Sequence, residues 1–350
     1  MSNPAIIDLP DRFRDRDIFR DHQGRMFVTL GYIQPSDRVL SFLKYIPDEN
    51  GKWQAGSIRY KRIFWGSVDT AVDGLSFLPQ NYTVFDSHFQ TDLVEPPRDV
   101  IKDYFRAEQR LGEILTEPTD ELERVVQKAA VTLHDELNIP FGNLGISGSV
   151  LWKGHNPSYS DINMNIYGFK ESWILQENYM NLENKENQIR IRSAPEWNHA
   201  IERVKKRIPS LETKALQTLF SRRKALYVKD RCIGITPILR PEETPIDHGS
   251  ESYTTLKSNL VRLSMVVKNA DYGIFHPAIY TTEPVEIDKA SVTRIMIYDG
   301  AFGGLLKNGD RIEVSGTLQR VNFTNSDIEF HQIMVGTKNG SGKEHIKLLS

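Results

Sequence analysis

The chain has 350 residues, enough for two or three domains, and its 39% hydrophobic and 26% charged residues are typical of a soluble globular protein. No apolar run approaches the ~20 residues that a membrane-spanning helix requires, so we expect no membrane partner and a cytoplasmic location. The single cysteine, Cys232, excludes an internal disulfide and a multi-cysteine zinc site. The formal net charge of −2 excludes a general electrostatic attraction to nucleic acid.

The first 97 residues predict a β-rich domain. Strand-like patterns occupy residues 25–32, 38–45 and 57–64, and a turn signal at 34–37 separates the first two. Aromatic and basic side chains interleave around the third pattern: Tyr45, Trp53, Tyr60, Lys61, Arg62, Phe64 and Trp65. Such a mixture can stack against a nucleic acid strand and neutralise it. A small sheet with its aromatic residues packed beneath it is the simpler interpretation, and we favour it.

A central domain is predicted over residues 98–242, after the boundary signal Pro96-Pro97. Two helices are expected first, at 99–115 and 119–137. The second has a capping signal at Thr119-Asp120. Its apolar residues recur at helical spacing: Leu122, Val125, Val126, Ala129, Ala130 and Leu133. This amphipathic helix leads into residues 144–168, which contain most of the candidate functional residues.

That stretch, residues 144–168, is typical of a strand, a tight turn, a short helix, a polar loop and a second strand. Gly148 permits a sharp turn, and a helix that starts there points free N–H groups outward, where Ser149 adds a hydroxyl donor. A phosphate suits such a turn. In the second strand, Asp161 and Asn163 share one face, about 7 Å apart at the backbone. The sequence therefore places a phosphate-ready turn close to an acidic strand.

The same residues carry a resemblance to a known family. Gly148-Ser149, followed about a dozen residues later by Asp161 at the start of a strand, resembles the DNA polymerase β-like nucleotidyltransferase superfamily. The longer run, which continues through His155-Asn156-Pro157 to Tyr167-Gly168, resembles a group of uncharacterised archaeal proteins with a nucleotidyltransferase domain.

The resemblance implies a function and a set of site residues. It implies that carboxylates on the acidic strand hold two Mg²⁺ or Mn²⁺ ions and that a nucleoside triphosphate is the substrate. By this resemblance Asp161 and Asn163 are the catalytic and metal-binding positions, and Gly148, Ser149 and Ser160 contact the nucleotide.

The sequence departs from the superfamily pattern at two points. The second motif acid is replaced by Asn163, whose amide oxygen can bind a cation but brings no negative charge. The third acid belongs on a later strand, and the matching pattern at 232–239 has no Asp or Glu; Asp230 just before it is the only nearby substitute.

Three interpretations stay open. The first is a metal-dependent nucleotidyltransferase, and the second is a catalytically degenerate relative that binds nucleic acid or protein. The third is a toxin-like or antitoxin-like enzyme that modifies a macromolecule, which rests on analogy of fold alone.

A basic segment follows at residues 189–240, with 13 Lys and Arg against 4 Asp and Glu. Helices are expected at 195–208 and 211–228. The candidate nucleotide-binding residues in them are Arg222, Arg223 and Lys224. These side chains can bind the triphosphate or the backbone of an acceptor RNA or DNA, and should then border the face of Asp161. A solvated helix face explains the charge run equally well.

Short alternating strands return after a polar linker at 241–250. They are expected at 256–267, 279–282, 293–298, 311–321 and 328–335. They predict a small barrel over residues 250–350, and residues 309–321 loosely resemble the strands of oligonucleotide-binding (OB) barrels. The chain is thus predicted to be α+β, with a central nucleotidyltransferase-like α/β domain between an N-terminal β-rich domain, residues 1–97, and a C-terminal OB-like barrel.

Overall fold

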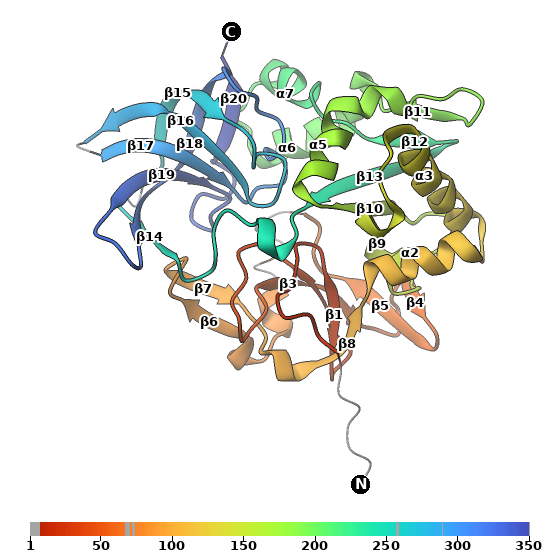
Figure 1. The fold of residues 1–350 in the computed structure, drawn as a ribbon. Coiled ribbons are helices and arrows are strands. Elements are labelled where there is room, and N and C mark those ends of the chain that lie inside the picture. The colour runs from red at the N-terminus through yellow and green to blue at the C-terminus, as the bar shows by residue number, and fades with distance from the viewer. Residues whose placement is uncertain (1–7, 67–70, 72–73, 257–258, 289, 350) are drawn as a thin grey trace.

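The computed structural model describes residues 8–66, 71, 74–256, 259–288 and 290–349. It is a mixed α+β structure, as the sequence predicts. Figure 1 shows three units built on sheets: an N-terminal sheet at the bottom, a central sheet with helices at the right, and a C-terminal barrel at the upper left. None of the described helices is long and apolar enough to cross a membrane.

The N-terminal unit is an antiparallel sheet with the strand order β4-β5-β3-β2-β1-β8. Its strands are β1 (Ile18–Asp21), β2 (Met26–Thr29), β3 (Ser41–Pro47), β4 (Trp53–Ala55), β5 (Ile58–Arg62) and β8 (Ile101–Phe105). A two-stranded ribbon of β6 (Thr83–Asp86) and β7 (Thr91–Val94) belongs to the same part of the chain. The strands predicted at 25–32, 38–45 and 57–64 are confirmed as β2, β3 and β5.

The central sheet has the strand order β11-β12-β13-β10-β9. Its strands are β9 (Leu144–Ser147), β10 (Ile162–Tyr167), β11 (Ile189–Ile191), β12 (Leu226–Val228) and β13 (Arg231–Ile238). The helices around it are α2 (Ala107–Thr116), α3 (Glu121–Leu137), α4 (Gly148–Leu151) and α5 (Phe169–Asn178). β10 lies between an antiparallel neighbour, β9, and a parallel neighbour, β13, so three segments that are distant in sequence meet at one strand.

Helix α3 begins and packs as the sequence predicts. The side chain of Asp120 accepts a hydrogen bond from the backbone N–H of Glu123 at 2.9 Å, and the predicted apolar face of the helix is buried. The helix predicted from residue 99 is wrong at its start, because residues 101–105 form β8 and the helix begins only at Ala107. β8 pairs with β1 along the sheet edge, and this tertiary pairing outweighs helical propensity.

The main hydrophobic core crosses from the central unit into the N-terminal sheet. Trp152, just after α4, packs edge-on against Tyr45 and Tyr60, with ring centroids 5.3 and 5.2 Å away. All three side chains are buried. Aromatic pairs of this kind add about 0.5–1.5 kcal/mol each beyond the area that they bury. The N-terminal sheet is therefore held firmly against the turn that carries Gly148.

The C-terminal unit is a barrel with two added strands. Its strands are β14 (Glu251–Thr255), β15 (Val261–Asn269), β16 (Ala278–Ile287), β17 (Ala290–Ile297), β18 (Arg311–Phe323), β19 (Glu329–Val335) and β20 (His345–Leu348). The pairings run β15-β16-β17-β19-β18 and return to β15, and only β17–β19 is parallel. The five strands predicted from the sequence are therefore confirmed, and they close into a ring.

Two helices from the basic segment pack on this barrel. These are α6 (Asn198–Arg207) and α7 (Thr213–Phe220). Their apolar side chains, including Ile201, Val204, Leu216 and Leu219, share a hydrophobic core with the barrel strands. Short 3₁₀ helices at Gly74–Phe77, Gln80–Tyr82, Arg98–Val100, Phe141–Asn143, Tyr179–Leu182, Ala194–Trp197 and Pro241–Glu243 complete the described elements. The basic segment thus belongs structurally to two units.

A buried polar network joins the β6–β7 ribbon to the linker before the barrel. Asp86 accepts backbone N–H groups from His88 and Phe89, at 2.7 and 2.8 Å, and its second oxygen lies 2.7 Å from His248 Nε2. Glu95 is only 3% exposed and shares a hydrogen bond with Asp86. Burial, together with this neighbouring carboxylate, raises the pKa of Glu95 to about 8. Glu95 therefore keeps its proton in the folded protein at neutral pH.

We predict that this proton makes stability depend on pH. A carboxyl group with a raised folded pKa loses stability as the pH rises from its ordinary value, about 4.5, towards 8. Glu95→Gln keeps a hydrogen-bond donor without the ionisation. The quantity to compare is the thermal unfolding midpoint of the variant minus that of the native protein. This difference should be larger at pH 8 than at pH 5 by about 2 °C or more. Calorimetry at both pH values measures it.

Exposed Glu49→Gln is the control, and it should leave the difference between the two pH values unchanged. A Glu95→Gln variant with the same pH profile as the native protein would show that Glu95 ionises freely. The histidines of the network, His88 and His248, are present in both proteins, so the comparison removes their contribution.

Candidate functional site

The turn between β9 and α4 is built around Gly148. Its φ of +65° lies in the left-handed region, which disfavours residues with a Cβ. A Cβ at this position would lie 3.2 Å from Asn163 Nδ2, and one at Gly234 on β13 would lie 3.6 Å from Asn163 Oδ1. The register explains both contacts, since Asn163 is opposite Ser147 on one side and opposite Gly234 on the other. The amide of Asn163 therefore lies between two glycines of neighbouring segments.

The polar residues of β10 differ in their exposure. Asp161, just before the strand, is exposed; Asn163 is half-buried; and Asn165 is buried, donating from Nδ2 to the hydroxyl of Tyr167 at 3.0 Å. The predicted alternation is confirmed, because Ile162, Met164 and Ile166 are buried in the core. A ligand on this face can therefore reach Asp161 and Asn163, which lie beside the Gly148 turn.

A basic side chain near Asp161 comes from the N-terminal sheet. Lys44 on β3 is half-buried and interacts electrostatically with Asp161. Burial lowers the pKa of Lys44 to about 7, with Arg62 and Arg16 adding to the effect and Asp161 opposing it. Sequence reasoning missed Lys44, because its proximity to Asp161 depends on how two units separated by over a hundred residues pack together.

The predicted basic residues lie elsewhere. Arg222 forms an ion pair with Asp310 and donates to Leu305 O, at 3.0 Å. Arg223 donates to the backbone oxygens of Gly300 and Ala301, and burial lowers its pKa to about 10. Lys224 donates to Gln176 O, at the end of α5. The structure thus places Gly148 beside Asn163, two residues after Asp161, while the side chains of Ser149 and Ser160 are buried. It places Arg222, Arg223 and Lys224 against the barrel and α5.

Ser160 and Asn156 shape the loop that leads to Asp161. Ser160 is buried, and its hydroxyl accepts the backbone N–H of Asn156 at 2.9 Å. Arg231 holds the tip of the same loop through the backbone oxygens of Pro157 and Ser158, at 2.7 and 3.3 Å. Ser160 therefore fixes the loop conformation with its hydroxyl oxygen, which sets the position of the next residue, Asp161.

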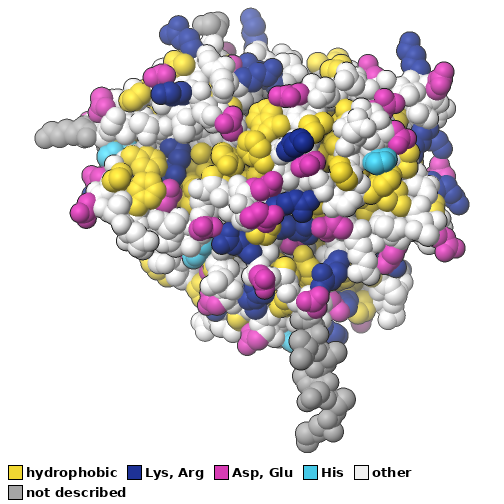
Figure 2. Space-filling model, viewed as in Figure 1, with side chains coloured by type: hydrophobic (Ala, Val, Ile, Leu, Met, Phe, Trp, Pro, Cys, Tyr) yellow, Lys and Arg dark blue, Asp and Glu magenta, His cyan; other side chains and the backbone are white. Residues whose placement is uncertain are grey.

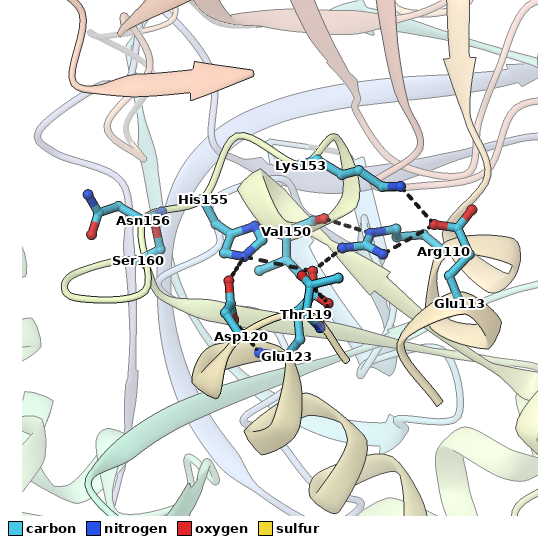
Figure 3. A network of polar contacts seen from close by, with 10 residues as sticks. All are labelled: Arg110, Glu113, Thr119, Asp120, Glu123, Val150, Lys153, His155, Asn156 and Ser160. Atoms are coloured by element: carbon cyan, nitrogen blue, oxygen red, sulfur yellow. Dashed lines mark hydrogen bonds and ion pairs between the residues drawn. The ribbon is translucent and has the colours of Figure 1, made fainter. Parts of the chain in front are cut away.

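A second network fixes the other end of this loop (Figure 3). His155 Nε2 lies 2.8 Å from Asp120 Oδ2 and 3.9 Å from Glu123 Oε1, and Arg110 forms an ion pair with Glu123. Figure 3 shows His155 and Arg110 approaching Glu123 from different sides. Burial raises the pKa of Asp120, but the Glu123 N–H and His155 outweigh it, so the net pKa is lowered.

Asp120, Glu123 and His155 also form a group that could hold a metal ion by distance alone. The carboxylate oxygens of this group and His155 Nε2 are already engaged, however. Glu123 accepts the N–H and hydroxyl of Thr119 at 2.8 and 2.9 Å and is neutralised by Arg110, while Asp120 caps α3. This arrangement explains the cluster as a structural lock between α3 and the loop after α4.

One surface hollow has arginines in its lining, and each of them is paired. It has a volume of about 650 Å³ and is lined by Arg12, Arg14, Tyr104, Arg106 and Glu108, among others. Its arginines are paired with carboxylates, for example Arg14 with Glu108 and Arg106 with Asp8. Figure 2 shows the same mixture of signs over this whole face of the molecule, with no large area of one charge.

The comparisons with known proteins give one distant relative. No family model matches the chain, and no solved structure matches it. The uncharacterised protein MJ1086 of Methanocaldococcus jannaschii is 25% identical over 348 residues, which cover 96% of this chain and 99% of the relative. The similarity therefore extends over all three units, and the relative is itself uncharacterised.

We predict that Gly148 is needed for the local conformation. Gly148→Ala should destabilise the fold by about 1–2 kcal/mol, because the left-handed backbone and the contact with Asn163 both oppose a Cβ. The matched control is Gly112→Ala in α2, where a Cβ meets nothing within 4 Å. It should stabilise the fold by about 0.5–1 kcal/mol. Chemical denaturation measures both, and equal effects would contradict the assignment.

Proposed function

We propose that this protein is a metal-dependent nucleotidyltransferase. The observation that carries the proposal is the register of β10 between β9 and β13, which brings the exposed carboxylate of Asp161, the amide of Asn163 and the Gly148 turn to one face. This is the arrangement that the sequence resemblance implies.

In the proposed reaction an acceptor hydroxyl attacks the α-phosphorus of a nucleoside triphosphate. The new P–O bond forms as the bond to the β-phosphate breaks, so pyrophosphate leaves and the proton of the hydroxyl is released. The backbone of the Gly148 turn would hold phosphate oxygens, and Asp161 would orient the acceptor and bind the cation. Lys44 would stabilise the negative charge of the phosphates.

The ligand atoms at this site are of the type that Mg²⁺ or Mn²⁺ binds, and together they carry little negative charge. Asp161 offers carboxylate oxygens and Asn163 an amide oxygen, which are the hard ligands that these ions prefer. A bound ion would supply charge neutralisation for the phosphates. Because only Asp161 contributes a formal charge, most ligands would have to come from the triphosphate itself.

We also propose that the C-terminal barrel is of the OB type. The ring β15-β16-β17-β19-β18 is a five-stranded closed barrel. Its parallel pair is β17 and β19, the third and fifth of these strands along the chain, which supports that assignment.

The alternative function is a binding protein on a degenerate catalytic scaffold. It is favoured by two observations: Asn163 brings no charge, and the β13 residue opposite it is Gly234 rather than an acid. RNA, DNA or a partner protein would then be the ligand.

We predict that Asp161→Asn abolishes nucleotidyl transfer. Mg²⁺ or Mn²⁺ and each radiolabelled nucleoside triphosphate are incubated with the native protein and an extract of acceptors, and the labelled product is measured. Removing the single charged ligand should lower the rate by at least about 100-fold, as the loss of one charge-stabilising group does elsewhere. Folding should persist, because Asp161 is exposed.

The control is Asp135→Asn, an exposed acid on α3, which should retain the activity. No metal-dependent triphosphate binding by calorimetry, and no labelled product, would refute the enzyme and favour the binding protein. The variant Asn163→Asp distinguishes further between the enzyme and the binding protein. A large gain of activity in this variant would indicate a degraded site, and a loss would show that the amide suits the native chemistry.

A further inference from the structure

The polar face of the central sheet continues from the candidate site to the outer edge of the sheet. Residues directly opposite each other on paired strands share a face. Cys232 on β13 is opposite Tyr227 on β12, and Tyr227 is opposite Arg190 on β11, the outermost strand. Cys232 comes two residues before Gly234, the partner of Asn163, so it shares their face. Cys232, Tyr227 and Arg190 therefore form one row that extends the face of Asn163.

Burial and charge support this arrangement. The residues on the other face of the same strands lie in the main hydrophobic core: Ile189, Leu226, Val228 and Ile233. By contrast, Cys232 and Tyr227 are half-buried and Arg190 is exposed. Cys232 also interacts electrostatically with Asp161. The row thus starts beside Asp161 and ends at a solvent-exposed arginine.

Arg190 is held in a fixed orientation at the end of the row. Its guanidinium carbon lies 4.0 Å from the ring centroid of Tyr227. Its two terminal nitrogens donate to the two carboxylate oxygens of Glu196, at 2.8 and 2.7 Å. The side chain is nevertheless 47% exposed. Because the ring covers one side of the guanidinium plane and Glu196 binds its edge, the other side of the plane is left for a flat ligand.

The space between Asp161 and Tyr227 suits the sugar of a nucleotide. The intervening residues on this face are Cys232, which has a small side chain, and Gly234, which has none. Among the described residues, only the Asn163 amide oxygen lies within 4 Å of a Cβ placed at Gly234, at 3.6 Å. β12 is two strands away from β10 in the sheet, a separation of about 10 Å. A nucleoside spans a comparable distance from its α-phosphate to its base.

We propose that Arg190 and Tyr227 form the subsite for the base of the nucleoside triphosphate. This inference rests on the proposed function, in which the phosphates lie at the Gly148 turn, across β10 from this row. The base stacks on the guanidinium plane of Arg190, a contact that proteins also use to hold unpaired bases of RNA. Glu196 neutralises the charge of Arg190, so the subsite favours an uncharged flat ring over a further phosphate.

Stacking also predicts the class of base. A purine covers more of the guanidinium plane than a pyrimidine does, and stacking by itself does not read the hydrogen-bonding edge of a base. The subsite therefore selects purine over pyrimidine nucleotides without choosing between adenine and guanine.

Arg124 on α3 provides the matched control. It is also exposed and forms an ion pair with a nearby acid, Glu121, at 3.6 Å. The apolar side chains of α3 share the main core with Leu226 and Val228, on the other face of β12. A substitution of Arg124 therefore makes the same chemical change on the opposite side of the sheet from the proposed subsite.

Isothermal titration calorimetry in the presence of Mg²⁺ tests the subsite without any acceptor. Each of ATP, GTP, CTP and UTP is compared with inorganic tripolyphosphate, which has the phosphates and no nucleoside. The native protein should bind ATP and GTP at least about tenfold more tightly than tripolyphosphate, and more tightly than CTP or UTP. Arg190→Ala and Arg190→Lys should both reduce this preference to within about threefold and leave the Kd of tripolyphosphate unchanged, because lysine keeps the charge but lacks the plane.

Arg124→Lys should keep the native preference. A retained preference in Arg190→Lys, an equal loss in Arg124→Lys, or tighter binding of CTP and UTP would overturn the subsite. Triphosphate binding with no preference over tripolyphosphate would overturn it too and leave the proposed function standing, whereas no triphosphate binding at all would refute both. Thermal unfolding confirms that each variant is folded.

Discussion

The arrangement of this protein depends on the pairing of β10 with both of its neighbours. A strand slip by one residue would turn Asp161 and Asn163 into the core and expose Ile162, Met164 and Ile166, so burial of those apolar residues fixes the register. That register then sets Asn163 between Gly148, where a side chain would crowd it, and Gly234. The candidate site is a consequence of packing on the other face of the same strand.

The N-terminal sheet takes part in this site as well. Trp152 belongs to the motif region, yet its ring contacts are Tyr45 and Tyr60, so the two units share one core and do not move freely against each other. The loop between α4 and β10 is secured near both of its ends, by His155 with Asp120 and by Ser160 with Asn156. Preorganisation of this kind places Lys44 near Asp161 without a conformational change.

Local patterns in the sequence predicted much of this fold. The capping residue Asp120 and the turn residue Gly148 can be recognised in the sequence itself. Apolar residues spaced three or four apart predict α3, and apolar residues at every second position predict β10 and the barrel strands. The contacts of Arg222 and Arg223 could not be predicted in this way. Their charge is visible in the sequence, but their partners, Asp310 and the oxygens at 300–301, lie some 80 residues away. Lys44 escaped notice for the same reason.

The charge balance around Asp161 bears on the order in which ligands bind. A site with a single carboxylate and a nearby lysine attracts a free divalent cation weakly, because the ammonium group opposes it. A triphosphate that already carries Mg²⁺ is attracted to the site, since Lys44 and Arg62 attract its remaining negative charge. If the site is catalytic, the replacement of the second acid by Asn163 therefore favours entry of metal and nucleotide together. The missing charge of the protein would then be supplied by the phosphates, and the affinity for metal alone says little about activity.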